Sequence, residues 1–164
     1  MELPIILAVI VLVLIAFGVR IVSQYEKAVV FTLGKFSRIL EQGFNVIVQF
    51  IQRSTKGDIR ERAVDVPSQD AITKDNISLN VNAVIYYKID DVAKSLINVR
   101  SLEYAIMQFA MTTMRNSIGQ FDLDELLSKR EEAGKKIMEI VENKSQEWWV
   151  NILSVEIKEI NLPD

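Results

Sequence analysis

The stretch that most constrains the fold covers residues 77–89, ISLNVNAVIYYKI, where apolar side chains recur at every second position. A period of two places alternate side chains on opposite faces of a β-strand. The face expected to be buried comprises Ile77, Leu79, Val81, Ala83, Ile85, Tyr87 and Ile89. The other face comprises Ser78, Asn80, Asn82, Val84, Tyr86 and Lys88. The chain must therefore build a sheet with one buried face around this strand.

Shorter patterns predict the rest of the sheet. The predicted strands are residues 27–33, a returning partner at 36–40 after the GKFSR turn, a half-buried strand at 58–67 closed by Pro67, and a final strand at 151–160. Residues 69–73 are expected to pair with 77–89 as a hairpin around the tripeptide KDN. Residues 44–51, FNVIVQFI, are consistent with a buried strand or with a segment lying against a membrane, because periodicity does not separate these for a short apolar run.

The period becomes helical from Asp91 onward. A short helix is expected at residues 91–99, a second at 101–119 with Ser101 as N-cap and Gly119 at its end, and a long third from Asp122 to about Glu147. The sequence DLDE at the start of the third helix is a capping box. Buried positions are predicted at Ala105, Ile106, Phe109, Ala110, Thr113, Met114 and Ser117, and at Leu123, Leu126, Leu127, Ile137, Val141 and Trp148. Together these patterns predict one α+β domain, an antiparallel sheet with packed helices.

An uncharged apolar run precedes this domain at residues 3–19. Extended to residue 22, with Arg20 reaching back to the headgroups, a helix of this length matches a bilayer core of about 30 Å. A cleaved signal peptide fits less well, because Glu2 stands where a basic residue is needed and no A-x-A site follows. Residues 1–22 are therefore predicted to be a transmembrane anchor and residues 23–164 the domain. The predicted anchor residues are Leu3, Ile10, Leu14, Phe17 and Arg20.

Basic residues indicate on which side of the membrane the domain lies. Arg20, Lys27, Lys35 and Arg38 follow the run and none precedes it. The positive-inside rule then predicts a single-pass protein with its bulk on the cytoplasmic side.

The composition excludes several kinds of chemistry. The chain has no cysteine and no histidine, so disulfides, thiolate catalysis and imidazole bases are absent. A net charge of −3 without a basic stripe gives no electrostatic footprint for nucleic acid. Capping explains the carboxylates at Asp122, Asp124 and Glu125 better than a metal does. No cofactor and no enzymatic activity are expected.

Four blocks of sequence resemble one family. They are YEKAVVFTLGKF, VDVPSQDAITKDNISLNVNAVIYYKI, MQFAMTTMRNSIGQFDLDELLSKRE and VEIKEINLPD. In this order they resemble the stomatin-like branch of the stomatin/prohibitin/flotillin superfamily, known as SPFH or band 7. The resemblance implies a band-7 fold, a following coiled coil that this chain does not contain, and a membrane scaffold. Such scaffolds assemble into rings or microdomains and regulate membrane proteases, channels or transporters.

The resemblance and the residues together suggest contact surfaces. Membrane contact is predicted for Phe44, Ile47, Phe50 and Ile51. An interface with further copies is predicted for Asn80, Asn82, Arg115, Lys129, Arg130, Glu132, Lys135 and Lys136. The polar strand face is alternatively solvated, which discourages edge aggregation, and the charged helix face alternatively serves solubility. The expected partners are further copies of the chain or a related subunit, the bilayer, and a membrane protease or channel.

Two other functions remain alternatives at this point. One is an anchored hydrolase of the Ser–Lys type, although the adjacent residues Ser128 and Lys129 would not face each other on a helix. The other is a monomeric membrane adaptor that only localises its partners.

Overall fold

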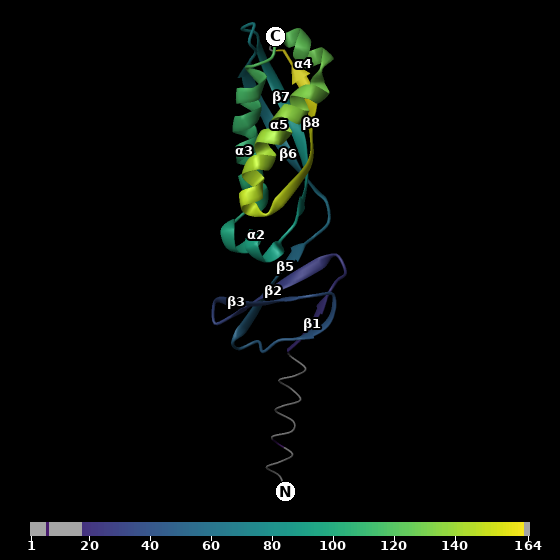
Figure 1. The fold of residues 1–164 in the computed structure, drawn as a ribbon, viewed down its shortest axis with the longest axis vertical. Coiled ribbons are helices and arrows are strands. Elements are labelled where there is room, and N and C mark those ends of the chain that lie inside the picture. The colour runs from purple at the N-terminus through teal and green to yellow at the C-terminus, as the bar shows by residue number, and fades with distance from the viewer. Residues whose placement is uncertain (1–5, 7–17, 163–164) are drawn as a thin grey trace. The chain divides into compact units, whose positions relative to one another are not determined.

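The computed structural model describes Ile6 and residues 18–162 (Figure 1). The chain divides into two compact units, Met1–Ile59 and Arg60–Asp164, which we call unit 1 and unit 2. The anchor residues Leu3, Ile10, Leu14 and Phe17 lie outside the described residues.

Unit 1 contains five short antiparallel strands: β1 (Val19–Val22), β2 (Glu26–Thr32), β3 (Lys35–Leu40), β4 (Gly43–Val46) and β5 (Gln52–Asp58). β1 pairs with β4, and β2 lies between β3 and β5. The predicted pairing of residues 27–33 with 36–40 is thereby confirmed. The small core consists of Val22, Ala28, Val30, Leu40 and Ile47.

The predicted helical anchor does not extend to residue 22, because Val19–Val22 form a strand whose last residue is buried in the core of unit 1. Gly18 belongs to the same junction: its carbonyl accepts from Ile47 N at 2.9 Å, and a Cβ at position 18 would lie 2.4 Å from Ile47 O. Glycine is therefore needed where this strand begins. In the part of the chain that the structure describes, no helix combines the length and the apolar character needed to cross a bilayer.

Unit 2 is built on a three-stranded antiparallel sheet of β6 (Arg62–Ile72), β7 (Ser78–Ile89) and β8 (Val150–Asn161), with β7 in the centre. The prediction for residues 77–89 is confirmed, since Leu79, Val81, Ala83, Ile85 and Tyr87 are all buried. The KDN hairpin is confirmed too, with Asn76 in the left-handed region that closes a three-residue turn.

Pro67 does not close its strand as predicted. β6 continues to Ile72 through an irregularity between Val66 and Gln69. A proline donates no ladder hydrogen bond, so it is tolerated here because β6 is an edge strand with a local bulge.

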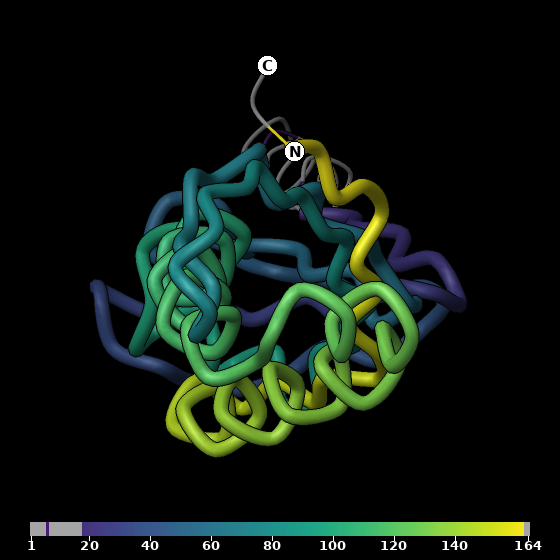
Figure 2. Tube along the Cα trace, turned by 90° about the horizontal axis from the view of Figure 1, so that it is seen from above, coloured from purple at the N-terminus to yellow at the C-terminus, as the bar shows by residue number. Residues whose placement is uncertain are grey.

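The helices of unit 2 are α2 (Val92–Asn98), α3 (Leu102–Ile118), α4 (Leu123–Ser128) and α5 (Arg130–Ser145), followed by the 3₁₀ turn η1 (Gln146–Trp148). α3 packs against β6, α5 packs against β8, and the two helices contact each other (Figures 1 and 2). They cover the apolar face of the sheet, and Ile106, Met114, Leu126 and Ile137 join its core.

The predicted long helix is in fact broken at Lys129, whose φ of −121° and ψ of 41° interrupt the helical geometry. Leu127, which was expected in the core, is consequently exposed. Gly134, an unfavourable residue inside a helix, has a packing role, because a Cβ there would lie 2.6 Å from Val155 O of β8.

The predicted start and end of α3 and the predicted start of α4 are right in position, although the caps of α3 differ from the prediction. Ser101 precedes α3 without a capping hydrogen bond from its side chain, and Gly119 ends α3 with an ordinary φ of −62°. Asp122 and Glu125 form the predicted capping box at the start of α4.

Candidate functional site

The most unusual backbone in unit 1 is the turn between β2 and β3. Leu33 and Gly34 both have positive φ, 49° and 84°, as a two-residue type I′ hairpin turn requires. Asn or Gly is normally found at the first of these positions, because a left-handed conformation costs an ordinary L-residue about 1–2 kcal/mol. Leu33 is nevertheless 80% exposed. An exposed leucine in a strained conformation is a reason to look for a function at this turn.

A second apolar turn precedes β5. Phe50 is 86% exposed there, and Ile51 beside it is also exposed. Gln52 fixes this turn: its Oε1 accepts from Val48 N at 3.0 Å, and its Nε2 donates to Thr32 Oγ1 of β2 at 3.2 Å. The loop therefore holds its apolar side chains outward on a defined backbone.

The two turns lie side by side, because Leu33 N donates to Ile51 O at 2.9 Å. We call Leu33, Gly34, Phe50 and Ile51 the paired tips. Between them is a groove of about 370 Å³, which is lined by the paired tips together with Phe31, Gln49 and Arg53.

A further apolar surface lies on the pair β1–β4. Ile21 is opposite Phe44, and Val19 is opposite Val46. Residues paired across antiparallel strands, and those two positions along, point to the same face. These four residues are therefore neighbours, and we call them the β1–β4 face. Ile21 and Phe44 are both more than two-thirds exposed.

Three of the four predicted membrane-contact residues, Phe44, Phe50 and Ile51, have side chains free to contact a membrane. The prediction of membrane contact for Ile47 is wrong, because its side chain is only 3% exposed and packs in the core of unit 1. Segment 44–51 is thus not a continuous buried strand: it contains most of the short strand β4 followed by an exposed turn. Arg20, the described anchor residue, lies exposed on β1.

In unit 2, the predicted interface residues Asn80 and Asn82 have partners within the chain. Asn80 Nδ2 donates to Asp70 Oδ1 at 2.8 Å, and Asn82 Oδ1 accepts from Glu159 N at 2.8 Å. The register between β7 and β8 shifts next to Asn82, leaving Lys158 as an extra residue on β8. The Asn82 side chain therefore satisfies a backbone N–H beside a β-bulge.

Lys158 also explains why Val84 is buried although its face of the sheet carries no helix. Asp65, Val84 and Glu156 form one cross-strand row. Lys158 Nζ reaches Asp65 Oδ1 at 3.1 Å, so its aliphatic stem crosses the sheet near Val84.

The remaining predicted interface residues lie on helices. Arg115 Nη2 donates to Gln69 Oε1 at 3.2 Å, which joins α3 to β6. Lys129 Nζ lies 3.8 Å from Glu132 Oε2, and Lys136 Nζ lies 5.2 Å from the centre of the Phe121 ring. Ser128 Oγ donates to Asp124 O at 2.6 Å, so its proton is directed at a helix carbonyl and away from Lys129.

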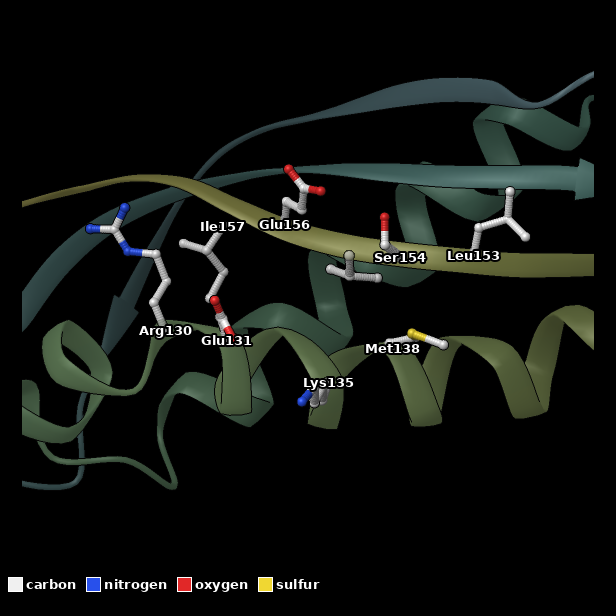
Figure 3. A pocket seen from close by; sticks show the side chains of 9 residues that line it. Arg130, Glu131, Lys135, Met138, Leu153, Ser154, Glu156 and Ile157 are labelled. Carbon is white, nitrogen blue, oxygen red and sulfur yellow. The ribbon is translucent and has the colours of Figure 1, made fainter.

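Arg130 and Lys135 line a groove of about 480 Å³ between α5 and β8 (Figure 3). Its other lining residues are Glu131, Met138, Leu153, Ser154, Val155, Glu156 and Ile157. Five consecutive strand residues contribute to it. Because side chains alternate between faces, a groove that meets all five runs along the open edge of β8.

Sequence reasoning missed Leu33, Gln52 and Arg53. The pair Leu33–Gly34 between two predicted strands was a signal for the turn, since its glycine suits a positive φ. No sequence signal indicated that the turn before β5 would lie beside it.

Comparison with known proteins identifies the family. The family described as SPFH domain / Band 7 matches residues 20–164. A protein of Methanocaldococcus jannaschii, named only as uncharacterized, is 43% identical over 97% of this chain and 80% of its own length. The stomatin homolog of Pyrococcus horikoshii is 36% identical over 93% of this chain and 58% of its own length.

A mammalian relative, the mitochondrial stomatin-like protein 2 of Rattus norvegicus, is 36% identical over 87% of this chain. The chain spans 40% of that protein, and little more than half of several archaeal relatives. The family match extends over both units, from within β1 to the last residue of the sequence. The chain therefore belongs to the SPFH domain / Band 7 family and is a stomatin-like member of it.

Proposed function

We propose that this protein is a membrane-anchored, oligomeric scaffold that organises membrane microdomains and regulates a membrane protease, channel or transporter. The observation that carries the membrane part is the exposed apolar surface of unit 1. Leu33 and Phe50 lie at the paired tips, and Ile21 and Phe44 lie on the β1–β4 face. Exposed apolar surface of this kind indicates a contact with a membrane or a partner.

The position of this surface favours the membrane. The strands of unit 1 begin at Val19, where the apolar run at residues 3–19 ends. If that run spans the bilayer, its tether keeps the apolar surface at high effective concentration near the lipid, so weak individual contacts suffice. Basic residues after the run support a cytoplasmic location of the domain.

Oligomeric assembly is supported by the groove between α5 and the edge of β8. Open strand edges and mixed-charge helix faces are common contact surfaces between subunits. The regulated client is part of the proposal at the level of its class only, because it rests on the family resemblance.

The membrane proposal is tested by removing residues 1–17 and measuring membrane retention after high-salt and carbonate extraction. The deletion stops before Gly18, because Gly18 and β1 contribute to unit 1. We expect release by carbonate and residual salt-resistant binding through the apolar surface. A truncated protein that still resists carbonate would contradict the anchor.

Assembly is tested by measuring particle mass in mild detergent. A large particle supports the scaffold, whereas monomer mass would favour the adaptor alternative. Incubation with serine-reactive probes tests the hydrolase alternative. Specific labelling of one serine would support that alternative.

A further inference from the structure

We propose that the groove between the paired tips binds the phosphate of an anionic phospholipid headgroup through Arg53. This inference rests on the proposed membrane contact and adds to it a ligand class and a residue that recognises it.

The charge of the groove favours an anionic ligand. Arg53 is the one charged residue among the described residues that line this groove. Its guanidinium has no hydrogen bond or ion pair to other described residues, whereas Arg38 of β3 donates from Nη2 to Val46 O at 2.9 Å. A guanidinium offers a planar fork of donors that matches phosphate oxygens. An anion is therefore the partner that this groove lacks.

The lining around that charge favours a lipid over a free ion. Phe31, Leu33, Phe50 and Ile51 surround it with apolar surface, and Gln49 is the other polar side chain. A free phosphate would leave this apolar surface in water. A phospholipid satisfies both parts, since its phosphate meets Arg53 while its acyl region meets the paired tips.

The distance of Arg53 from the tips also fits a lipid headgroup. Arg53 is opposite Phe31 in the β2–β5 ladder, and Phe31 lies two residues before Leu33 at the tip. Two residues of strand correspond to about 7 Å. Apolar groups of interfacial segments enter the membrane by roughly 5–10 Å. Tips inserted to that depth would place Arg53 at the level of the phosphates.

The chain has no cysteine, so one introduced thiol gives a specific label. Phe50→Cys in the full chain, labelled with an environment-sensitive fluorophore, is reconstituted into nanodiscs. One set contains phosphatidylcholine alone and the other contains phosphatidylcholine and phosphatidylglycerol in equal parts. We expect a blue shift in both sets and a larger shift with phosphatidylglycerol.

Arg53→Gln should keep the shift in phosphatidylcholine and reduce the additional shift. In a titration of phosphatidylglycerol, it should raise the fraction needed for half the effect about fivefold, the expected worth of one basic residue near an anionic surface. The matched control is Lys27→Gln, which removes one positive charge from β2 outside the groove. The control should behave as the parent protein does.

The possible outcomes separate the two proposals. If Arg53→Gln keeps the additional shift, or Lys27→Gln reduces it equally, the phosphate site is wrong while the membrane contact stands. If inorganic phosphate abolishes the additional shift at matched ionic strength, the site takes free phosphate and the lipid assignment is overturned. If no bilayer shifts the probe, the membrane contact itself is wrong.

Discussion

The two units of this chain differ in how large a core their apolar residues form. Unit 2 builds a large one: every inward position of β7 from Leu79 to Tyr87 is buried in a core that residues of α3 and α5 join. Unit 1 keeps a core of five side chains and leaves Ile21, Leu33, Phe44 and Phe50 exposed. The difference is not one of composition but of available depth, since small sheets without helices have little interior to fill.

This contrast indicates which interactions stabilise each unit. Unit 2 contains its own stabilising core. Unit 1 has so small a core that a bilayer covering its exposed apolar residues would add a large part of its stability. Perturbations of the two units should therefore be read out by different measurements, and five predictions test that separation.

The largest effect is expected from Ile85→Ala in the central strand of unit 2. Ile85 is fully buried, and removing three carbons from a packed core costs about 2–5 kcal/mol. Thermal unfolding should show the loss, whereas membrane retention of the folded protein should not change. Ile140→Ala on the exposed side of α5 is the matched control, with a loss below about 1 kcal/mol expected. Equal losses at both positions would contradict the assigned core.

The double variant Leu33→Asn, Phe50→Ser should weaken membrane binding without lowering the unfolding temperature. Burial of a leucine or phenylalanine in lipid contributes roughly 1.5–3 kcal/mol each, so membrane binding by the protein without residues 1–17 should fall by a few kcal/mol. Vesicle flotation measures this membrane binding. Asn suits the positive φ of position 33, so unfolding should occur at an unchanged or higher temperature. Reduced folding together with reduced binding would leave the tips without a demonstrated membrane role.

Gly134→Ala tests how closely α5 approaches β8. Alanine improves helix propensity by about 1 kcal/mol, but its Cβ would lie 2.6 Å from Val155 O. We expect overpacking to prevail, with a net loss of about 1–2 kcal/mol in chemical denaturation. A stabilised variant would show that the helix moves away at little cost.

The charged residues of the α5–β8 groove test assembly. Arg130→Glu with Lys135→Glu reverses both cations that line it, and should shrink the particle measured in mild detergent while the monomer stays folded. Contributions of exposed pairs are small, about 0.2–1 kcal/mol each, so the effect depends on their number in the assembly. Lys136→Gln is the comparison outside the groove, where only a contact with Phe121 is lost. Unchanged particle size with matching circular dichroism would leave these charges a solubilising role.

The smallest effects concern pH. The Thr73 hydroxyl, followed by Leu123 N, holds the pKa of Asp75 below its ordinary value; the Lys94 N–H does the same for Asp91. In unit 1 the Lys56 ammonium lowers the pKa of Glu26. A carboxyl with a lowered folded pKa adds stability above its unfolded pKa and loses it as pH falls through the folded value. Stability should therefore decline below about pH 4. Asp75→Asn should weaken that decline in a pH series of melting curves, and an unchanged slope would contradict this linkage.

Periodicity predicted most of unit 2 because its strands and helices are amphipathic on a fixed period. The alternation at 77–89 and the helical stripe at Ile106, Ala110 and Met114 both bury the expected side chains. The break at Lys129 was not predictable in this way, because no glycine or proline marks it and the pattern continues across it.

Unit 1 and its candidate site were harder to predict for a physical reason. Its strands are short, and a segment such as 44–51 contains buried Ile47 between exposed Phe44 and Phe50. The paired tips depend on hydrogen bonds between the Gln52 side chain and residues four and twenty positions away, one accepted from Val48 N and one donated to Thr32 Oγ1. Such contacts leave no periodic trace in the sequence.

The bulge at Lys158 has a consequence for how the sheet finds its correct alignment during folding. β7 and β8 are separated by five helical segments, and sliding one strand by two residues would keep every apolar side chain on the inner face. Hydrophobic patterning therefore cannot distinguish the native alignment from such a slip. The bond from Glu159 N to Asn82 and the reach of Lys158 to Asp65 exist in one alignment only. These polar contacts on the uncovered face therefore distinguish the native register from registers that bury the same apolar side chains. Removing the contacts should raise the fraction of misaligned chains during refolding before it lowers the stability of the native sheet.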